Sequence, residues 1–242
     1  MDIVIVNTPT EFDKRAADVV CEAIEQEPDL LLVLPTGNTP LGMFRELVSR
    51  VKSGEVDFSR ITLAQLDEYA GIDADDPRSL YLWLKRELID PIEFPESRVL
   101  RFDPRAADPA AEALRIEEAI RAAGGIGMSV LGLGPNGHLG VNEPGTAFDA
   151  RTFLAKLTPE SLISNGRYWG GAENVPPTAY TLGLGSLAEA RRTLLLVSGE
   201  SKTGVLRQVV DGPVGPDVPA TVLRNVEKVT VLADQVAGRL LG

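Results

Sequence analysis

The sequence predicts an α/β fold with three layers: a mostly parallel, doubly wound sheet with helices on both faces. Segments of strand character alternate with segments whose apolar residues recur at helical spacing along most of the chain. Some strand segments are continuous apolar runs, as expected for strands buried on both sides by helices. The 242 residues suffice for one such domain or two small ones, and we expect residues 1–242 to form a single domain.

The predicted strands are short and end at turn residues or helical segments. Residues 2–6 (DIVIV) are interpreted as a strand. Residues 30–34 are an uninterrupted apolar run that ends at a Pro-Thr-Gly turn, which indicates a buried strand. The later predicted strands cover residues 61–66, 99–102, 126–133, 193–198 and 229–233.

Helical periodicity fills most of the intervals between these strands. The predicted helices cover residues 10–24, 41–51, 79–88 and 109–123, and a helical stretch is expected after each of the last two strands. Residues 165–177 are rich in glycine, proline, asparagine and aromatic residues. We therefore expect a mobile surface segment there, as a lid at about residues 158–180.

The composition excludes several classes of protein. Hydrophobic residues make up 44% of the chain and charged residues 24%, which is ordinary for a protein that buries a core. The formal net charge is −11, so we expect no nucleic-acid partner, because proteins that bind a phosphate backbone are normally basic. The same field repels small anions, so an anion site must be built locally from backbone amides and a few placed cations.

The sequence also predicts a cytoplasmic protein that does not enter membranes. It has no apolar run of about 18 residues, the length of a membrane span. Its N-terminus has no basic region followed by an apolar secretion segment. The one cysteine, Cys21, cannot form an internal disulfide, and we expect it to be an inert buried thiol.

Polar or glycine-rich segments follow the predicted strands at several places. They are residues 35–40 (PTGNTP), 67–69 (DEY), 132–145 (GLGPNGHLGVNEPG) and 199–202 (GESK). Ligands of open parallel sheets bind outside the carboxyl ends of the strands. We therefore expect these segments to meet in one active site.

The segment 132–145 has glycines at its first, third and sixth positions, which is the spacing of a dinucleotide-binding Rossmann loop. That loop also requires a long helix directly after the third glycine and an acidic residue about 20 residues later. Gly140 and Pro144 come too soon for such a helix, which argues against a dinucleotide site. Residues 199–203 likewise lack the glycine that precedes the lysine of a P-loop.

The same segment holds the only histidine of the chain, His138, with Glu143 five residues later. A carboxylate beside an imidazole can fix the tautomer of the ring and raise its basicity, as a proton shuttle requires. A histidine that only caps a tight turn is the alternative. A single histidine with no nearby cysteine is a poor ligand set for a transition metal, so we expect no metal site.

In this order, the segments resemble the glucosamine-6-phosphate deaminase (glucosamine-6-phosphate isomerase) family, which shares a superfamily with 6-phosphogluconolactonase. The resemblance runs over nearly the whole chain. It covers a phosphate loop at 34–40, a catalytic-aspartate segment at 66–69, a histidine–glutamate segment at 134–144, a lid arginine segment at 164–169 and a phosphate-lysine segment at 199–202.

The resemblance implies a reaction in which an amino-sugar ring opens, the aldose becomes a ketose, and ammonia is released. D-Glucosamine 6-phosphate would become D-fructose 6-phosphate. His138 is implied as the proton shuttle of ring opening, Glu143 as its partner, and Asp67 as the base near C2, where partial desolvation would raise its basicity. Glu68 is expected to be a solvated or structural neighbour. No cofactor is implied, because the carbon skeleton is not oxidised.

The resemblance also implies how the phosphate of the substrate is bound. Gly37, Asn38 and Thr39 offer amides and a hydroxyl at an expected helix N-terminus, where anions are favoured. Arg167 can hold a phosphate through two parallel hydrogen bonds, and Lys202 adds a point charge.

Two features depart from the best-known deaminases. Asn136 stands in place of an aspartate; it can hydrogen-bond but cannot carry a proton, and it stays among the candidate catalytic residues because some members have asparagine there. Phe153 and Ala155 stand where allosteric hexameric members place basic residues. We therefore predict no activation by N-acetylglucosamine 6-phosphate, and a monomer or small homo-oligomer.

Other functions stay open at this stage. In the lactonase branch the histidine is typically followed by a run like Thr-Ala-Ser-Leu-Phe-Pro, whereas here the run is Leu-Gly-Val-Asn-Glu-Pro. Galactosamine 6-phosphate enzymes share the scaffold, and no motif places the contacts to O4 of the sugar. A non-catalytic sugar-phosphate sensor would keep the phosphate grip but would not need Asp67, His138 and Glu143.

Overall fold

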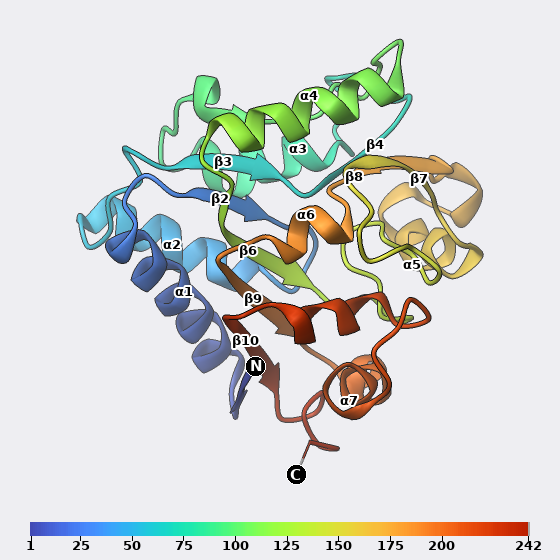
Figure 1. Ribbon diagram of the computed structural model, residues 1–242. Coiled ribbons are helices and arrows are strands. Elements are labelled where there is room, and N and C mark those ends of the chain that lie inside the picture. The colour runs from blue at the N-terminus through green and yellow to red at the C-terminus, as the bar shows by residue number, and fades with distance from the viewer. Residues whose placement is uncertain (242) are drawn as a thin grey trace.

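A computed structural model describes residues 1–241 and contains a large and a small sheet (Figure 1). The large sheet has seven strands in the order β1-β10-β9-β6-β2-β3-β5, and all its pairings are parallel. These strands are β1 (Asp2–Val6), β2 (Leu31–Leu34), β3 (Thr62–Gln65), β5 (Val99–Leu100), β6 (Ile126–Gly132), β9 (Arg192–Val197) and β10 (Val229–Asp234). The predicted mostly parallel sheet is confirmed.

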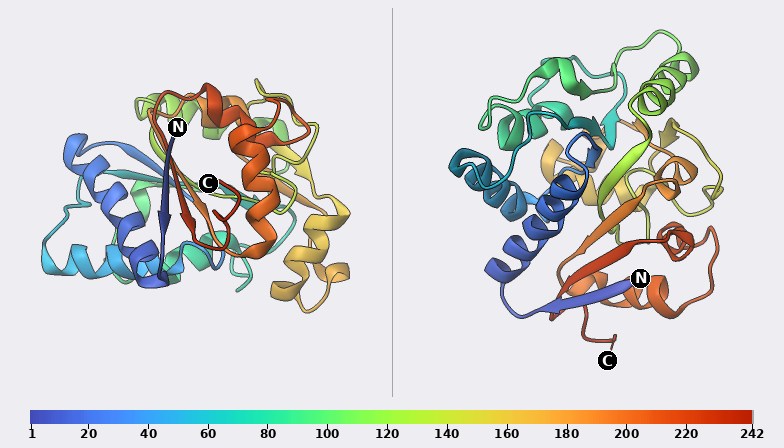
Figure 2. Two further views of the ribbon diagram at one scale, coloured as in Figure 1. Left: turned by 90° about the horizontal axis from the view of Figure 1, so that it is seen from below. Right: turned by 60° about the vertical axis from the view of Figure 1, so that its left-hand side comes forward.

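Helices cover both faces of the large sheet (Figures 1 and 2). One face packs on α1 (Pro9–Gln26), α2 (Leu41–Ser53) and α3 (Leu80–Leu84); the other packs on α4 (Pro109–Ala122), α6 (Leu184–Ala188) and α7 (Thr203–Asp211). Residues of β2 alternate between the two cores: Leu32 and Leu34 lie in the first, and Leu31 and Val33 in the second. Both faces are buried, which is why this strand is apolar throughout.

The long helices begin at residues that the sequence marks as helix starts. Thr8 is the N-cap of α1, and its hydroxyl accepts a hydrogen bond from the Glu11 amide at 3.1 Å. Asp108 is the N-cap of α4 and accepts from the Ala110 amide at 2.9 Å. A proline follows each cap, where its fixed φ suits the first helical turn and its missing N–H costs nothing.

The small sheet is antiparallel and was not predicted. Its strands, in the order β4-β8-β7, are β4 (Asp67–Tyr69), β8 (Thr178–Thr181) and β7 (Phe153–Lys156). The chain passes from β3 into β4 through Leu66, whose carbonyl oxygen accepts a hydrogen bond from the Leu182 amide at 3.0 Å. These strands are too short for a clear two-residue periodicity, and their partners are distant in sequence.

Two helix predictions need correction. The helix expected at 79–88 is α3 followed by a π-helix, Lys85–Ile89. The helical stretch expected after the last strand is wrong, because residues 235–240 form turns. None of the helices within residues 1–241 is long and apolar enough to cross a membrane.

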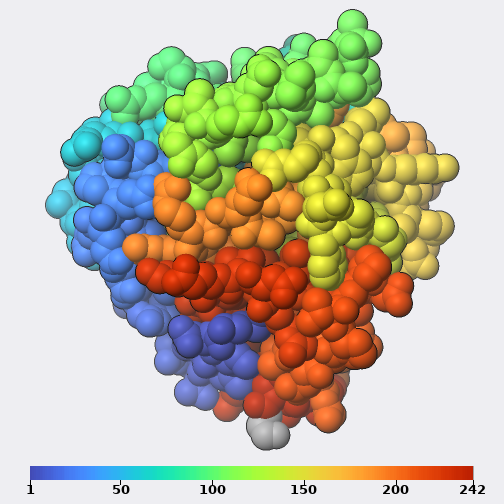
Figure 3. All heavy atoms as spheres, viewed as in Figure 1, coloured from blue at the N-terminus to red at the C-terminus, as the bar shows by residue number. Residues whose placement is uncertain are grey.

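The expected lid segment has regular structure. It contains α5 (Pro159–Trp169), a 3-10 helix (Ala172–Asn174) and the start of β8. The other 3-10 helices are Glu96–Arg98, Glu200–Lys202 and Pro219–Asn225. In the space-filling view, the yellow part of the chain around residue 150 lies beside the orange and red C-terminal third (Figure 3). Motion of the segment 158–180 stays a prediction.

Candidate active site

The structure brings the polar and glycine-rich segments together at one edge of the large sheet. Strands β9, β6 and β2 are neighbours, and the segments that follow them contribute Lys202, His138 and Thr39 to one pocket of about 470 Å³. The small sheet adds Asp67 from β4, and α5 adds Arg167. The pocket therefore lies outside the carboxyl ends of the strands, as the rule for open parallel sheets requires.

The site residues expected from the sequence fall into two groups. Those that line the pocket are Gly37, Asn38, Thr39, Asp67, His138, Arg167 and Lys202. Asn136 and Glu143 lie behind His138 and contact it from the protein side.

The loop between β2 and α2 has the features expected of an anion cradle. Gly37 has a φ of 97°, in the left-handed region that favours glycine. Pro40 occupies the N-cap position of α2. A proline has no polar side chain to satisfy the amides of the first helical turn, so these donors suit an anion at the N-terminus of α2.

Two cations face the same pocket. Lys202 is partly buried, at the end of the short 3-10 helix after β9, and Arg167 lies on α5. Burial and the positive charge of Arg167 lower the pKa of the Lys202 ammonium to about 8. A bound phosphate would relieve that repulsion, so the pair is suited to an anionic ligand.

Asp67 is a carboxyl group with raised basicity. It is partly buried, lies opposite Thr181 in the small sheet and lines the pocket. Burial, and secondarily the negative charge of Glu68, raise its pKa to about 7. At neutral pH this carboxyl can therefore both take up and return a proton.

The neighbouring carboxylate, Glu68, has a structural place. It is 1% exposed and points away from Asp67, since successive residues of a strand face opposite sides. Its oxygens accept hydrogen bonds from the amides of Leu80 (3.0 Å) and Tyr81 (2.9 Å) in the first turn of α3, and from the Ser79 hydroxyl (2.6 Å). Glu68 is thus structural, and the alternative of a solvated side chain is wrong.

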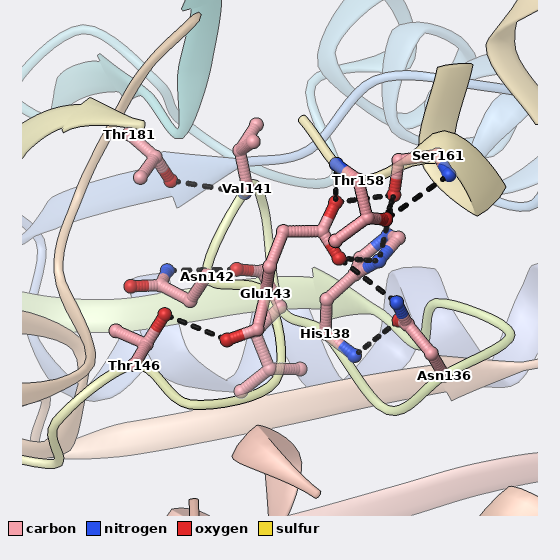
Figure 4. Close-up of polar contacts among 10 residues, drawn as sticks. Asn136, His138, Val141, Asn142, Glu143, Thr146, Thr158, Ser161 and Thr181 are labelled. Carbon is pink, nitrogen blue, oxygen red and sulfur yellow. Dashed lines mark hydrogen bonds and ion pairs between the residues drawn. The ribbon is translucent and has the colours of Figure 1, made fainter. Parts of the chain in front are cut away.

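His138 and Glu143 form a pair (Figure 4). His138 Nδ1 lies 3.5 Å from Glu143 Oε2. Asn136 Nδ2 donates to the same oxygen at 2.8 Å, and Asn136 Oδ1 accepts from the His138 amide at 3.3 Å. Asn136 therefore orients the pair through hydrogen bonds on both of its members.

The Glu143 carboxyl is held in its ionised form. It is 7% exposed, and this burial opposes ionisation. The contacts from His138, Ser161 and Asn136 outweigh the burial and lower its pKa to about 2. Glu143 is thus a fixed negative charge beside the imidazole and stays ionised at neutral pH.

The glycine spacing around residue 134 serves the histidine. A Cβ added to Gly134 would lie 2.3 Å from the nearest ring atoms of His138, closer than any real contact. The Gly134 amide also donates to the His138 carbonyl oxygen at 2.9 Å. The glycine at 134 in this loop, whose spacing resembles a dinucleotide-binding fingerprint, therefore leaves space for the His138 ring.

Apart from Arg167, the residues of α5 and its surroundings that contact this site were not predicted from the sequence. The Ser161 hydroxyl contacts both Glu143 and His138, and the Thr158 amide donates to Glu143 Oε1 at 3.3 Å. Trp169 packs edge-on against Tyr69 at 5.0 Å, with the Arg78 guanidinium 4.1 Å over its ring. The Thr-Pro helix start at 158 was visible in the sequence, but its packing partner was not.

The chain is similar to known proteins over most of its length. Residues 8–232 match the family of glucosamine-6-phosphate isomerases and 6-phosphogluconolactonases. The chain belongs to this family. A glucosamine-6-phosphate deaminase of Halothermothrix orenii is 37% identical over 241 residues, which cover 100% of both chains. Glucosamine-6-phosphate deaminase 1 of Bacillus subtilis is 35% identical over 240 residues, which cover 99% of each chain.

Solved structures of the family show the same fold. A monomeric glucosamine-6-phosphate deaminase of the NagB superfamily is 35% identical and superposes with a TM-score of 0.96, over 99% of this chain and 100% of that one. The 6-phosphogluconolactonase of Trypanosoma brucei has a TM-score of 0.80 over 100% of this chain and 98% of that one, at 21% identity. The second likeness concerns the fold alone.

Proposed function

We propose that the protein isomerises and deaminates a hexosamine 6-phosphate, converting D-glucosamine 6-phosphate and water to D-fructose 6-phosphate and ammonia. The observation that carries the proposal is one pocket that joins a carboxyl of raised pKa, Asp67, to the His138–Glu143 pair and to the cations Lys202 and Arg167. The relatives named glucosamine-6-phosphate deaminase support the choice of substrate.

Binding of the phosphate anchors the sugar. The loop of Gly37, Asn38 and Thr39 offers amides and a hydroxyl at the start of α2, and Lys202 and Arg167 add two positive charges. The phosphate does not react, so its binding energy serves to hold the distant end of the sugar in a reactive position. This local site also overcomes the net charge of −11.

Ring opening requires that a proton leave O1 and that O5 receive one. Glu143 faces Nδ1 of His138, which leaves Nε2 for the substrate. The fixed negative charge of Glu143 stabilises the imidazolium that forms while the proton is in transit. Asn136 holds this pair in place but carries no proton itself.

Isomerisation and deamination follow from the open-chain amino-aldose. Asp67 removes the proton from C2, and the C1 oxygen gains a proton as the 1,2-enolamine forms. The same carboxyl then delivers a proton to C1, which leaves an imine at C2. Water adds to this imine, ammonia departs, and the ketone of fructose 6-phosphate remains. A pKa of about 7 lets Asp67 act as base and then as acid. No step calls for a cofactor.

The experiment that tests the proposal is ammonia release from purified protein. Glucosamine 6-phosphate and galactosamine 6-phosphate are supplied in parallel, with Asp67→Asn as the matched inactive control. We expect release from the gluco epimer and none from the variant. Release only from the galacto epimer would keep the chemistry and change the substrate.

The remaining alternatives have their own outcomes. Hydrolysis of 6-phosphogluconolactone without ammonia release would assign the protein to the lactonase branch. Binding of glucosamine 6-phosphate with neither activity would indicate a sugar-phosphate sensor. Either result would refute the proposed deaminase.

The proposal extends to the organisation of the protein. We propose one domain over residues 1–242, with residues 158–180 as a lid, acting in the cytoplasm, where phosphorylated sugars are retained. We also propose a monomer or small homo-oligomer, which is supported by the monomeric relative and by the neutral residues Phe153 and Ala155. Light scattering of the purified protein tests the last point.

A further inference from the structure

A hydroxyl group on α5 contacts both members of the histidine–glutamate pair (Figure 4). Ser161 Oγ donates a hydrogen bond to Glu143 Oε1 and lies 3.5 Å from His138 Nδ1. Ser161 is 3% exposed and is absent from the residues that line the pocket within the described part of the chain. Its hydroxyl therefore acts on the pair and does not touch a ligand of the pocket.

A chain of hydroxyl groups fixes the direction of these bonds. The Thr158 hydroxyl donates to Ser161 Oγ at 3.2 Å, so the Ser161 proton is free to point at Glu143. Glu143 Oε1 thereby accepts hydrogen bonds from the Ser161 hydroxyl and the Thr158 amide. Glu143 Oε2 accepts one from the Asn136 side chain and faces His138 Nδ1. One carboxylate oxygen is therefore bound by α5 and its N-cap, and the other by residues of the loop that holds His138.

The Ser161 side chain is not needed to start the helix. Thr158 is the N-cap of α5, and its hydroxyl accepts from the Ser161 backbone amide at 3.3 Å. That cap depends on the backbone of Ser161 and would survive loss of its side chain. The Ser161 hydroxyl thus has one clear target, the buried Glu143 carboxylate.

The same helix reaches the other end of the site. Arg167 and Trp169, in its last turn, line the pocket, and Trp169 packs between Tyr69 and Arg78. The position of α5 therefore places Arg167 in the pocket and Ser161 against Glu143 together.

We propose that Ser161 is a positioning residue, which holds Glu143 against His138 Nδ1 through a hydrogen bond from α5. The inference rests on the proposed function in so far as it concerns turnover. Independently of turnover, we infer that Glu143 and the Ser161 hydroxyl together set the tautomer of the His138 ring.

The test compares Ser161→Thr with Ser161→Val. The two new side chains have nearly the same shape, but threonine keeps a hydroxyl group where valine has a methyl group. Ile163→Ala, on the same helix with a side chain 71% exposed, is the matched control. We expect Ser161→Val to lower kcat about 10- to 100-fold, as loss of a hydrogen bond to a charged group predicts. KM should change little, because the phosphate contacts are untouched. Ser161→Thr and Ile163→Ala should keep kcat within about threefold.

A second readout does not depend on turnover. His138 is the only histidine, so its imidazole nitrogens give a single, unambiguous pair of ¹⁵N NMR signals. We expect the wild type, Ser161→Thr and Ile163→Ala to carry the proton of the neutral ring on Nδ1. In Ser161→Val the two nitrogens should share it. Circular dichroism establishes that each variant is folded.

The outcomes separate this inference from the proposed function. An inactive wild type would refute the proposed function, while the NMR comparison would still test Ser161. Equal kcat and equal imidazole signals in Ser161→Val and Ser161→Thr would overturn the inference, even with an active enzyme. A loss confined to KM would also overturn it, since that result would place Ser161 in substrate binding.

Discussion

Replacement of Asp67 by asparagine should inactivate the protein and stabilise it at the same time. Burial, together with the charge of Glu68, raises the pKa of Asp67 from 3.8 to about 7. Each tenfold change in an ionisation equilibrium corresponds to about 1.4 kcal/mol, so the fold disfavours the ionised carboxylate by up to about 4 kcal/mol. Asparagine has nearly the same shape and never ionises, so it removes this cost.

The sign of the effect fixes its pH dependence. Below about pH 4 the carboxyl is protonated in the folded and the unfolded chain, and no penalty applies. Between about pH 4 and pH 7 the folded state retains a proton that the unfolded state has lost, so the stability of the wild type falls as pH rises. Above about pH 7 the full penalty is present and constant.

The assay is urea unfolding of the wild type and Asp67→Asn at several pH values from 4 to 8, followed by tryptophan fluorescence. The difference in unfolding free energy should grow in favour of the variant from pH 4 to about pH 7 and then level off. Asp76→Asn is a control of opposite sign, because hydrogen bonds from Arg78 lower the pKa of Asp76. This variant should be less stable than the wild type by an amount that stays nearly constant from pH 4 to 8, since Asp76 titrates below that range. A difference for Asp67→Asn that is independent of pH would refute the reasoning. Turnover near that of the wild type would refute the assignment of Asp67 as the base.

Two further variants test the rest of the site. Lys202→Ala should mainly raise KM. Burial and Arg167 lower the pKa of Lys202 to about 8, so the KM of the wild type should itself rise above that pH. A KM that changes neither in the variant nor with pH would show that Lys202 does not bind the phosphate. Gly134→Ala should lower kcat at least about tenfold, because its Cβ would meet the His138 ring at 2.3 Å. The control Gly204→Ala meets no atom within 4 Å and should keep wild-type kcat; an equal loss in both variants would contradict the steric explanation.

Much of the large sheet follows from local sequence. The run at 30–34 is apolar because β2 is buried on both faces, and Thr8 and Asp108 with their following prolines begin α1 and α4. Parallel strands place their carboxyl ends at one edge, so Asp67 and His138 could be assigned to one site before their distance in space was known.

The small sheet and the contacts of α5 do not follow in this way. β4, β7 and β8 pair residues that are far apart in the chain, and each is too short for its own periodicity to identify it. Ser161 has no local mark either, because a serine near a helix start is common. Its role depends on which loop the helix packs against.

The sequence by itself determined the fold class and the identity of the chemical groups, because periodicity and the positions of turns and acid–base residues are properties of neighbours in the chain. Only the tertiary structure decided whether those acid–base groups are ionised at neutral pH. The pKa of Asp67 near 7 and that of Glu143 near 2 belong to two carboxyl groups that are chemically alike. Burial beside Glu68 raises the first, and hydrogen bonds from separate segments lower the second. Burial and contacts of that kind exist only once the chain has folded.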